Sequence, residues 1–253
     1  MTDRFSLSGE NAIVTGSTRG IGLAIARGFL EHGCNVTICG RNKEGVDAAL
    51  GQLKDHAGRV QGVAAHVAKT EDVHRLISAS EERFGPANIL VNNAATNPYA
   101  GPILDSEDWA WAKTLDVNLK APYQLSRELG KQMGQRGGGS IINIASIAGL
   151  TASPNQGIYS VSKAGLIMLT KVMAREMGRQ KVRVNCLCPG VIRTKLSEVM
   201  WSAPEVEHQV ASQKALGRIG EPDEIVGAAV YLASDASSFT TGAVIQIDGG
   251  MVL

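Results

Sequence analysis

Three side chains in the second half of the sequence have the types and spacing of a proton-transfer site. Tyr159 and Lys163 stand four residues apart, and Ser146 lies thirteen residues before Tyr159. Residues four apart on a helix share one face, so the phenol and the ammonium would share a pocket. A nearby positive charge favours an ionised phenol, and we expect Lys163 to move the pKa of Tyr159 from about 10 toward neutrality. The pattern predicts acid/base catalysis, although Tyr and Lys also fall at this spacing by chance.

A motif near the N-terminus predicts a partner for that chemistry. An apolar run at 11–15 is followed by the glycine-rich stretch 16–22, and the next ten residues have helical spacing. Strand, glycine turn and helix in this order form the usual binding site for a dinucleotide pyrophosphate. Gly16 would permit the tight turn, Gly20 the approach of the phosphates and Gly22 close packing of the helix on the strand. The alternative is a plain connection between a strand and a helix.

The second strand favours one nicotinamide cofactor over the other. It is expected at 35–39 and ends in Cys39-Gly40-Arg41-Asn42, without the carboxylate that would bind the ribose hydroxyls of NAD. Arg41, together with Arg19 of the glycine turn, could hold a 2'-phosphate with paired guanidinium donors. These residues predict NADP(H), unless both arginines are simply solvated surface charges.

At this point the sequence resembles the short-chain dehydrogenase/reductase family over nearly its whole length. The resemblance rests on the turn at 15–22, the segment Asn92-Asn93-Ala94-Ala95, Asn118 and the turn Pro189-Gly190, besides the motif of Tyr159 and Lys163. It implies that Tyr159 is the general acid, that Ser146 hydrogen-bonds the substrate oxygen, that Lys163 binds the nicotinamide ribose and tunes Tyr159, and that Asn118 supports a water in the proton relay. The cofactor contacts that it implies are Gly16, Ser17, Thr18, Arg19, Gly20, Ile21, Gly22, Arg41, Asn42, His66, Val67, Asn93, Ala94, Tyr159, Lys163, Pro189, Gly190, Ile192 and Thr194.

Within the family, the segments 66–72, 92–98 and 136–140 look like the NADPH-dependent carbonyl and retinal reductase branch. Two residues depart from the family pattern. His66 stands where an aspartate usually binds the adenine amino group, and Ala95 replaces a glycine. His66 could donate or accept through a ring nitrogen, or end its strand without a special task.

The elements that would position these residues alternate in type along the chain. Apolar runs predict strands at 11–15, 35–39, 60–65, 89–92, 140–144, 182–188 and 243–247, and helical spacing predicts helices near 20–32, 43–56, 71–84, 107–135, 156–178 and 222–234. This alternation is typical of a Rossmann-like, doubly wound parallel α/β sheet of about seven strands. We expect residues 1–253 to form a single domain, with the motifs beyond the carboxyl ends of the strands.

Loops set the substrate, and the segment 192–217 is predicted to be a lid. Leu196, Val199, Met200 and Trp201 suit an apolar or aromatic carbonyl compound, although Met200 and Trp201 could equally pack a short helix onto the body. The sequence therefore predicts an NADPH-dependent reductase of ketones or aldehydes that also works in reverse. One alternative is a 3-oxoacyl-thioester reductase, for which Arg193 and Lys195 could meet phosphate or an acyl-carrier protein. Another is a non-catalytic NADP-binding regulatory protein on the same fold.

Composition bears on the partners, the metal sites and the location of the protein. The formal net charge of +1, with charges of both signs interspersed, favours neither nucleic acid nor a membrane as a partner. The five histidines are scattered and predict no metal site, and the four cysteines fit reduced thiols in a cytoplasmic protein. The family resemblance implies a homotetramer or homodimer built through the long helices expected at 107–135 and 156–178. The apolar end of the chain, Met251-Val252-Leu253, would also suit cover by another subunit.

Overall fold

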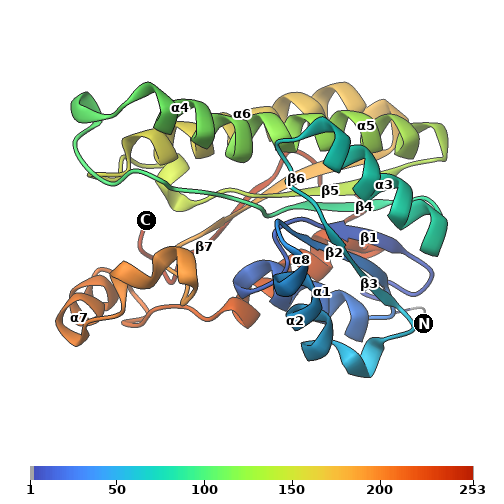
Figure 1. Cartoon of the computed structure of the whole chain (residues 1–253), viewed down its shortest axis with the longest axis horizontal. Helices are drawn as coiled ribbons and strands as arrows, with labels where there is room; N and C mark the ends of the chain where they lie inside the picture. The colour runs from blue at the N-terminus through green and yellow to red at the C-terminus, as the bar shows by residue number, and fades with distance from the viewer. Residues whose placement is uncertain (1–2, 253) are drawn as a thin grey trace.

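The computed structural model describes residues 3–252, which include a seven-stranded parallel sheet with helices on both faces (Figure 1). The strand order is β3-β2-β1-β4-β5-β6-β7, and neighbouring strands pair in parallel. The strands are β1 (Asn11–Val14), β2 (Asn35–Gly40), β3 (Val60–Ala64), β4 (Ile89–Asn92), β5 (Gly139–Ile144), β6 (Val182–Pro189) and β7 (Val244–Ile247). The predicted fold is confirmed, and Leu253 of the expected apolar tail lies outside the described residues.

Helices α3, α5 and α6 cover one face of the sheet, and α1, α2 and α8 cover the other (Figure 1). The α-helices are α1 (Gly20–Glu31), α2 (Lys43–Gln52), α3 (Thr70–Phe84), α4 (Asp108–Leu115), α5 (Ala121–Gln135), α6 (Gly157–Met177), α7 (Pro204–Ser212) and α8 (Val226–Ala233). Short helical turns that matter below are η3 (Asp116–Lys120), η4 (Ile147–Gly149), η6 (Lys195–Met200) and η7 (Pro222–Ile225).

The helix expected at 107–135 is interrupted, and proline is the physical reason. Residues 116–120 form a wider π-helical turn between α4 and α5, and Pro122 stands in the first turn of α5. Proline has no N–H, so the carbonyl of Asn118, four residues earlier, lacks its α-helical donor. Helix α7, inside the expected lid, was not among the predicted helices.

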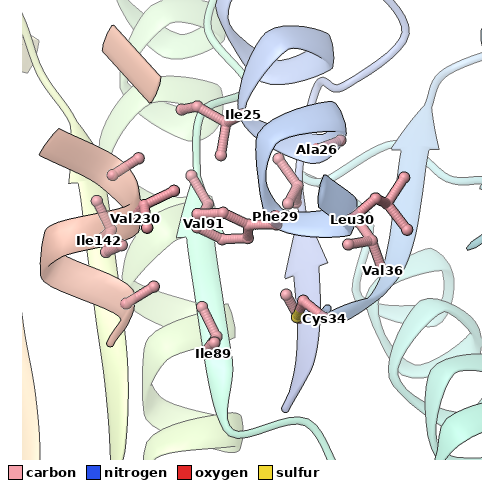
Figure 2. Packing of buried hydrophobic residues seen from close by; sticks show 14 of the residues in the cluster. Ile25, Ala26, Phe29, Leu30, Cys34, Val36, Ile89, Val91, Ile142 and Val230 are labelled. Carbon is pink, nitrogen blue, oxygen red and sulfur yellow. The ribbon is translucent and has the colours of Figure 1, made fainter. Parts of the chain in front are cut away.

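Apolar side chains fill the space between the sheet and each helical layer. On one face Phe29 of α1 is fully buried beside Val91 of β4, Ile142 of β5 and Val230 of α8 (Figure 2). Burying a phenylalanine of this kind contributes about 2–3 kcal/mol to folding. Because both faces are covered, the strands present nearly continuous apolar runs, and the polar residues collect where the strands end.

Candidate active site

Ser146, Tyr159 and Lys163 lie just beyond the carboxyl end of β5. Ser146 caps the turn η4, and its hydroxyl accepts a hydrogen bond of 3.1 Å from the Ala148 N–H. Tyr159 and Lys163 stand on the first turns of α6. The ammonium nitrogen of Lys163 lies 5.5 Å from the centre of the Tyr159 ring and donates a 2.8 Å hydrogen bond to the Ile144 carbonyl. The expected sharing of one pocket by the phenol and the ammonium is therefore present.

The expected lowering of the Tyr159 pKa is wrong. Burial raises the pKa of Tyr159 to about 12, and a hydrogen bond from Ser146 only partly opposes the rise. Lys163 is itself only 2% exposed, and its burial lowers its pKa to about 8. Attraction between the two charges favours the ionised phenol, and the expectation rested on that effect alone. Desolvation penalises both charged forms and is the larger effect here. The phenol is consequently held in its protonated form.

Asn118 lies in the π-helical turn and is fully buried. Its side-chain oxygen accepts from the Thr96 N–H at 2.8 Å, and its amide nitrogen donates to the Thr96 carbonyl at 2.9 Å and to the Ser162 hydroxyl at 3.0 Å. Ser162 in turn donates to the Tyr159 carbonyl at 2.7 Å. The Asn118 amide thus fastens the loop after β4 to the helix that carries Tyr159.

The glycine turn has the shape that a dinucleotide requires. Gly16 has a φ of +62°, and a Cβ there would lie 2.7 Å from the Ala94 Cα. A Cβ on Gly22 would collide with the Asn93 side chain and lie 2.7 Å from the Gly16 carbonyl oxygen. Helix α1 begins at Gly20 after Arg19, whose side chain does not cap it. The first amides of α1 therefore point outward without a side-chain acceptor, as binding of a pyrophosphate demands.

Hydrogen bonds join the ends of β1 and β4 beneath this turn. The Thr15 hydroxyl donates to the Val91 carbonyl at 3.2 Å and accepts from the N–H groups of Asn93 at 3.0 Å and Ala94 at 3.1 Å. The Asn93 amide nitrogen donates to the carbonyls of Thr15 at 2.8 Å and Gly16 at 2.9 Å. Thr15 was expected to be part of the motif, but its role in fastening the two loops was not foreseen.

Five of the expected cofactor residues lie in the glycine turn or at the end of β2. Arg19 and Arg41 are both exposed, and neither forms an ion pair within residues 3–252. Thr18 packs against Gly40, the residue before Arg41. Asn42 caps α2 by accepting a 3.1 Å hydrogen bond from the Gly45 N–H. Buried Ser17 uses its hydroxyl to donate to the Val14 carbonyl at 2.6 Å.

His66 and Val67 follow β3 at the same edge of the sheet. The backbone N–H of His66 donates to the Asp72 carboxylate at 2.8 Å. The Nδ1 atom of the His66 ring accepts a 3.2 Å hydrogen bond from the Ala68 backbone N–H. In a neutral ring this leaves Nε2 as a donor, which does not suit acceptance from an adenine amino group. Val67 is buried in the core layer beside α3.

The remaining expected residues follow β6. Pro189 ends the strand, and the Gly190 N–H donates to the Ile247 carbonyl at 2.9 Å. Ile192 is buried, and Thr194 caps η6 in a reciprocal arrangement with Ser197. A Cβ on Gly20 would lie 3.1 Å from the Thr194 Cγ2, so the base of the expected lid touches the glycine turn.

The structure also identifies contributors that the sequence did not single out. They are Ser162, Thr96 and the Ile144 carbonyl, each of which holds an expected catalytic side chain in place. Only Ser162 carried a signal, because it stands one helical turn after Tyr159 on the same helix. Within residues 3–252, no group of three or more His, Cys, Asp or Glu side chains could hold a metal ion, and no helix is long and apolar enough to cross a membrane.

Comparison with known proteins identifies the family of the chain. A family model described as "Enoyl-(Acyl carrier protein) reductase" matches residues 16–252. The human protein called Dehydrogenase/reductase SDR family member 4 is 40% identical over 250 residues, covering 99% of this chain and 90% of the relative. The chain belongs to the short-chain dehydrogenase/reductase family. The Caenorhabditis elegans protein of the same name is 42% identical over 247 residues, covering 96% of this chain and 95% of that short-chain dehydrogenase/reductase.

Solved structures of other short-chain dehydrogenases superpose closely on this one. A gluconate 5-dehydrogenase from Burkholderia cenocepacia, in complex with NADP and tartrate, gives a TM-score of 0.93 at 34% identity and covers 98% of this chain and 97% of its own. A 7α-hydroxysteroid dehydrogenase complexed with NADH and 7-oxo glycochenodeoxycholic acid gives a TM-score of 0.93 at 28% identity, covering 99% and 97%. The protein is therefore an oxidoreductase of a family that uses NAD or NADP.

Proposed function

We propose that this protein is an NADP(H)-dependent oxidoreductase that reduces a ketone or aldehyde carbonyl to an alcohol, reversibly. The observation that carries the proposal is the grouping of Ser146, Tyr159 and Lys163 at the sheet edge where the glycine turn opens α1. When bound, NADPH would supply the hydride, and the protein would supply orientation, a proton and a hydrogen bond.

Each side chain has a role suited to its surroundings. Tyr159, protonated because burial raises the pKa of its phenol, donates a proton to the carbonyl oxygen of the substrate. Ser146 donates a hydrogen bond to the negative charge that grows on the same oxygen. Lys163 places a positive charge beside the phenol at the moment when Tyr159 loses its proton, and it also binds the nicotinamide ribose. Its ammonium is held by the Ile144 carbonyl for that task.

Asn118 completes the proposed proton relay through its backbone. The Asn118 side chain already makes three hydrogen bonds, so it has little capacity left for water. Its carbonyl, however, is the one left without an α-helical donor by Pro122. A water held by that carbonyl would return a proton to Lys163 and Tyr159 after each turnover.

NADP rather than NAD is the proposed cofactor because of the two unpaired guanidinium groups. Arg19 and Arg41 are both exposed, and paired guanidinium donors of this kind would bind the 2'-phosphate of NADP. The remaining proposed cofactor contacts are Gly16, Ser17, Thr18, Gly20, Ile21, Gly22, Asn42, His66, Val67, Asn93, Ala94, Pro189, Gly190, Ile192 and Thr194. Since His66 presents a donor at Nε2, we assign it to an acceptor of the adenine ring rather than to the amino group.

The substrate is proposed to be a small carbonyl compound or alcohol under a lid formed by 192–217. Leu196 and Val199 in this segment are 53% and 75% exposed, which gives the lid apolar surface to place over an organic substrate. The similar enzymes named above act on a sugar acid and on a steroid, so relatives of this fold accept small molecules of different polarity.

A 3-oxoacyl-thioester reductase is the second candidate. The matching family model is described as an enoyl-(acyl carrier protein) reductase, which favours an acyl-carrier-protein partner, although an enoyl group is reduced at a carbon–carbon double bond and not at a 3-oxo carbonyl. The two basic residues expected to meet the carrier do not favour it, because Arg193 binds Glu207 and Glu221, and Lys195 is paired with Glu198. Their charges are therefore neutralised within this chain.

Oxidation of NADPH and NADH at saturating concentrations, with aromatic ketones, α-diketones, retinal and a 3-oxoacyl thioester, tests the proposal. We expect turnover to be selective for NADPH. We expect it to fall at least about a thousandfold in Tyr159→Phe, because this variant loses the hydroxyl that donates the proton and keeps the aromatic ring. Turnover of the thioester alone would favour the second candidate. Unchanged turnover in the variant would overturn the assigned role of Tyr159. Tight NADPH binding without any turnover would favour a non-catalytic NADP-binding protein.

The chain is further proposed to act as a single domain in the cytoplasm and to assemble as a homotetramer or homodimer. The outward side of α5 and α6 carries Tyr123, Val161, Met168 and Val172, which are 42% to 58% exposed. An apolar strip of this kind on two long neighbouring helices suits burial against a second copy.

A further inference from the structure

The segment between Ile192 and Ser212 is held to the rest of the molecule mainly by polar contacts. Helix α7 has no buried residue, and η6 has none either. Burial of apolar area therefore contributes little to fixing the position of this segment. Its hydrogen bonds and ion pairs are therefore the contacts that chiefly fix it.

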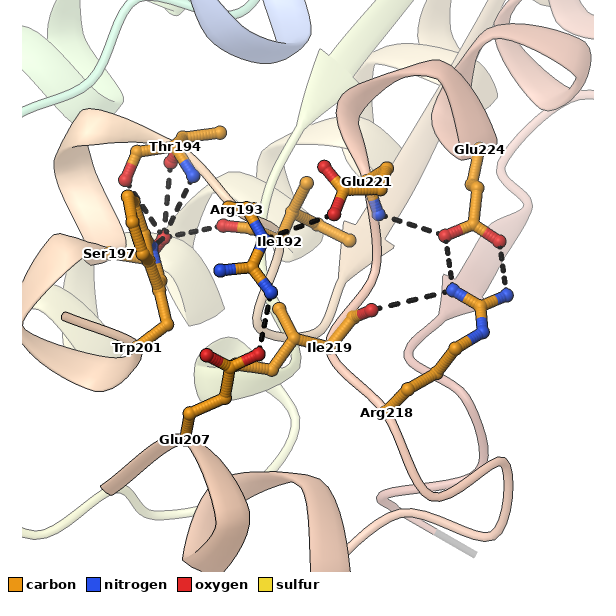
Figure 3. A network of polar contacts seen from close by, with 10 residues as sticks. All are labelled: Ile192, Arg193, Thr194, Ser197, Trp201, Glu207, Arg218, Ile219, Glu221 and Glu224. Carbon is orange, nitrogen blue, oxygen red and sulfur yellow. Dashed lines mark hydrogen bonds and ion pairs between the residues drawn. The ribbon is translucent and has the colours of Figure 1, made fainter. Parts of the chain in front are cut away.

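Arg193 is the centre of those contacts (Figure 3). Its Nη2 lies 2.6 Å from a Glu207 carboxylate oxygen on α7, and its Nε lies 3.0 Å from a Glu221 carboxylate oxygen on the body. The guanidinium also lies over the Trp201 ring, 5.1 Å from the ring centre. The Arg193 N–H donates to the Gly220 carbonyl at 2.8 Å, which fixes the backbone from which this side chain extends.

Trp201 is fixed in turn by the first turn of η6. Its indole N–H donates to the Ser197 hydroxyl at 3.2 Å, and that hydroxyl bonds the Ile192 carbonyl. The ring is thus held in place over the Arg193 guanidinium. A planar guanidinium with a carboxylate on two edges and an aromatic ring on one face has few alternative positions.

Glu221 connects this cluster to the layer that carries the glycine turn. The Glu221 N–H donates to Glu224 at 2.8 Å, and the two residues cap η7 reciprocally. Helix α8 follows η7 directly, and a Cβ on Gly28 of α1 would collide with Val226, the first residue of α8. Glu221, which binds Arg193, therefore belongs to the pair of η7 and α8, and α8 packs against α1, the proposed cofactor-binding helix.

We propose that Arg193 is the positioning residue of the lid: by joining Glu207 to Glu221 beneath Trp201, it fixes α7 in the place where the lid retains a carbonyl substrate. Arg193 touches neither the substrate nor the cofactor in this role. The link to substrate retention rests on the proposed function, whereas the fastening of α7 does not.

The decisive variant is Glu207→Gln, and Glu205→Gln is its matched control. Both remove one negative charge from α7, but exposed Glu205 forms no ion pair within residues 3–252. With the aromatic α-diketone phenylpropanedione as the probe, we expect Glu207→Gln to raise KM about threefold with kcat and the Kd of NADPH unchanged, since a partly exposed ion pair has modest strength. Equal KM values in the two variants would overturn the proposal.

Two further measurements separate positioning from a general loss of structure. Added salt should raise the KM of the native protein toward that of Glu207→Gln and should leave the variant nearly unaffected, because the pair is partly exposed and screened. Trp201→Phe, which keeps a ring over the guanidinium, should retain a KM closer to the native value than Trp201→Ala does. Salt-independent KM in the native protein would contradict a role for the ion pair.

Hydrogen–deuterium exchange of residues 204–212 tests the fastening without any substrate. The backbone amides of α7 should exchange several-fold faster in Glu207→Gln than in Glu205→Gln. Faster exchange with no turnover on any probe would mean that Arg193 does fasten α7 and that the proposed function is wrong. Identical exchange in the two variants would overturn the proposed fastening of α7 through Arg193 and Glu207, even if the enzyme is active.

Discussion

Lys163 carries opposite consequences for stability and for chemistry. Its folded-state pKa of about 8 lies below the ordinary lysine value of 10.5, because burial disfavours the ammonium. A lysine with a depressed pKa costs stability below about pH 8, and that cost fades as the pH rises through the interval up to the unfolded value. At neutral pH the penalty is of order 3 kcal/mol, offset in part by the bond to the Ile144 carbonyl.

Lys163→Met should therefore be more stable and inactive. We expect its melting temperature at pH 7 to rise by roughly 5 °C while turnover is lost, because an apolar side chain of similar length removes the desolvation cost. Thermal unfolding followed by circular dichroism measures the shift. The gain should shrink when the pH is raised toward 10, and a lower melting temperature at pH 7 would contradict the burial argument.

Ser162 and Ser160 allow a matched test of the hydrogen bonds around Asn118. Ser162→Ala removes the acceptor of the Asn118 amide, and we expect a loss of about 1 kcal/mol of stability together with reduced turnover. Ser160 lies on the same helix, and its buried hydroxyl has no partner among residues 3–252, so Ser160→Ala should be neutral or slightly stabilising. Denaturant unfolding of both variants decides the matter, and equal losses would show that the bond to Asn118 contributes nothing specific.

The sequence allowed the site residues to be chosen by type and spacing, because position on a helix face follows from residue number alone. It did not allow the sign of the Tyr159 pKa shift to be predicted. That sign depends on how much solvent the surrounding elements exclude, and the segments that surround Tyr159 and bury Lys163 are distant in sequence. The tautomer of His66 was open for a similar reason, since it follows from a single bond to Ala68.

Among the elements, the glycine turn is the one whose local sequence is least replaceable. Gly22→Ala would bring a methyl group into the Asn93 side chain and the Gly16 carbonyl. We expect a loss of about 1–3 kcal/mol of stability and greatly weakened NADPH binding. Gly51→Ala on α2 is the control, because nothing lies within 4 Å of the added methyl and the helix should gain about 0.5–1 kcal/mol. Calorimetric titration with NADPH measures binding in both variants. Normal NADPH binding by Gly22→Ala would contradict the expected loss.

Element positions were predictable to the extent that they follow from apolar periodicity. Each of the seven strands lies within one residue of its expected boundaries. The interruption at 116–120 was missed because proline is also common in the first turn of a helix, so Pro122 alone does not distinguish a new helix from a π-helical turn. Helix α7 was missed because it has no apolar face to give a periodic signal.

For the whole molecule, assembly is the property that the sequence constrained least. Met168 is 58% exposed on α6 within the apolar strip. In a dimer or tetramer built on that strip, Met168→Glu would bury a charge without a partner and shift the protein toward monomers. Sedimentation velocity over a dilution series measures the shift, with Lys54→Glu, an exposed change of charge just after α2 on the other face of the sheet, as the control. An unchanged sedimentation coefficient would place any interface elsewhere.

Helix α7 has a consequence for how this enzyme diversifies. A helix with no buried residue can exchange nearly all of its side chains without disturbing the packed interior. The catalytic side chains, by contrast, sit among buried partners, where most changes are costly. Variation in descendants of this chain should therefore accumulate over α7 while the Glu207 position is kept, so that new substrates are acquired without a new catalytic centre.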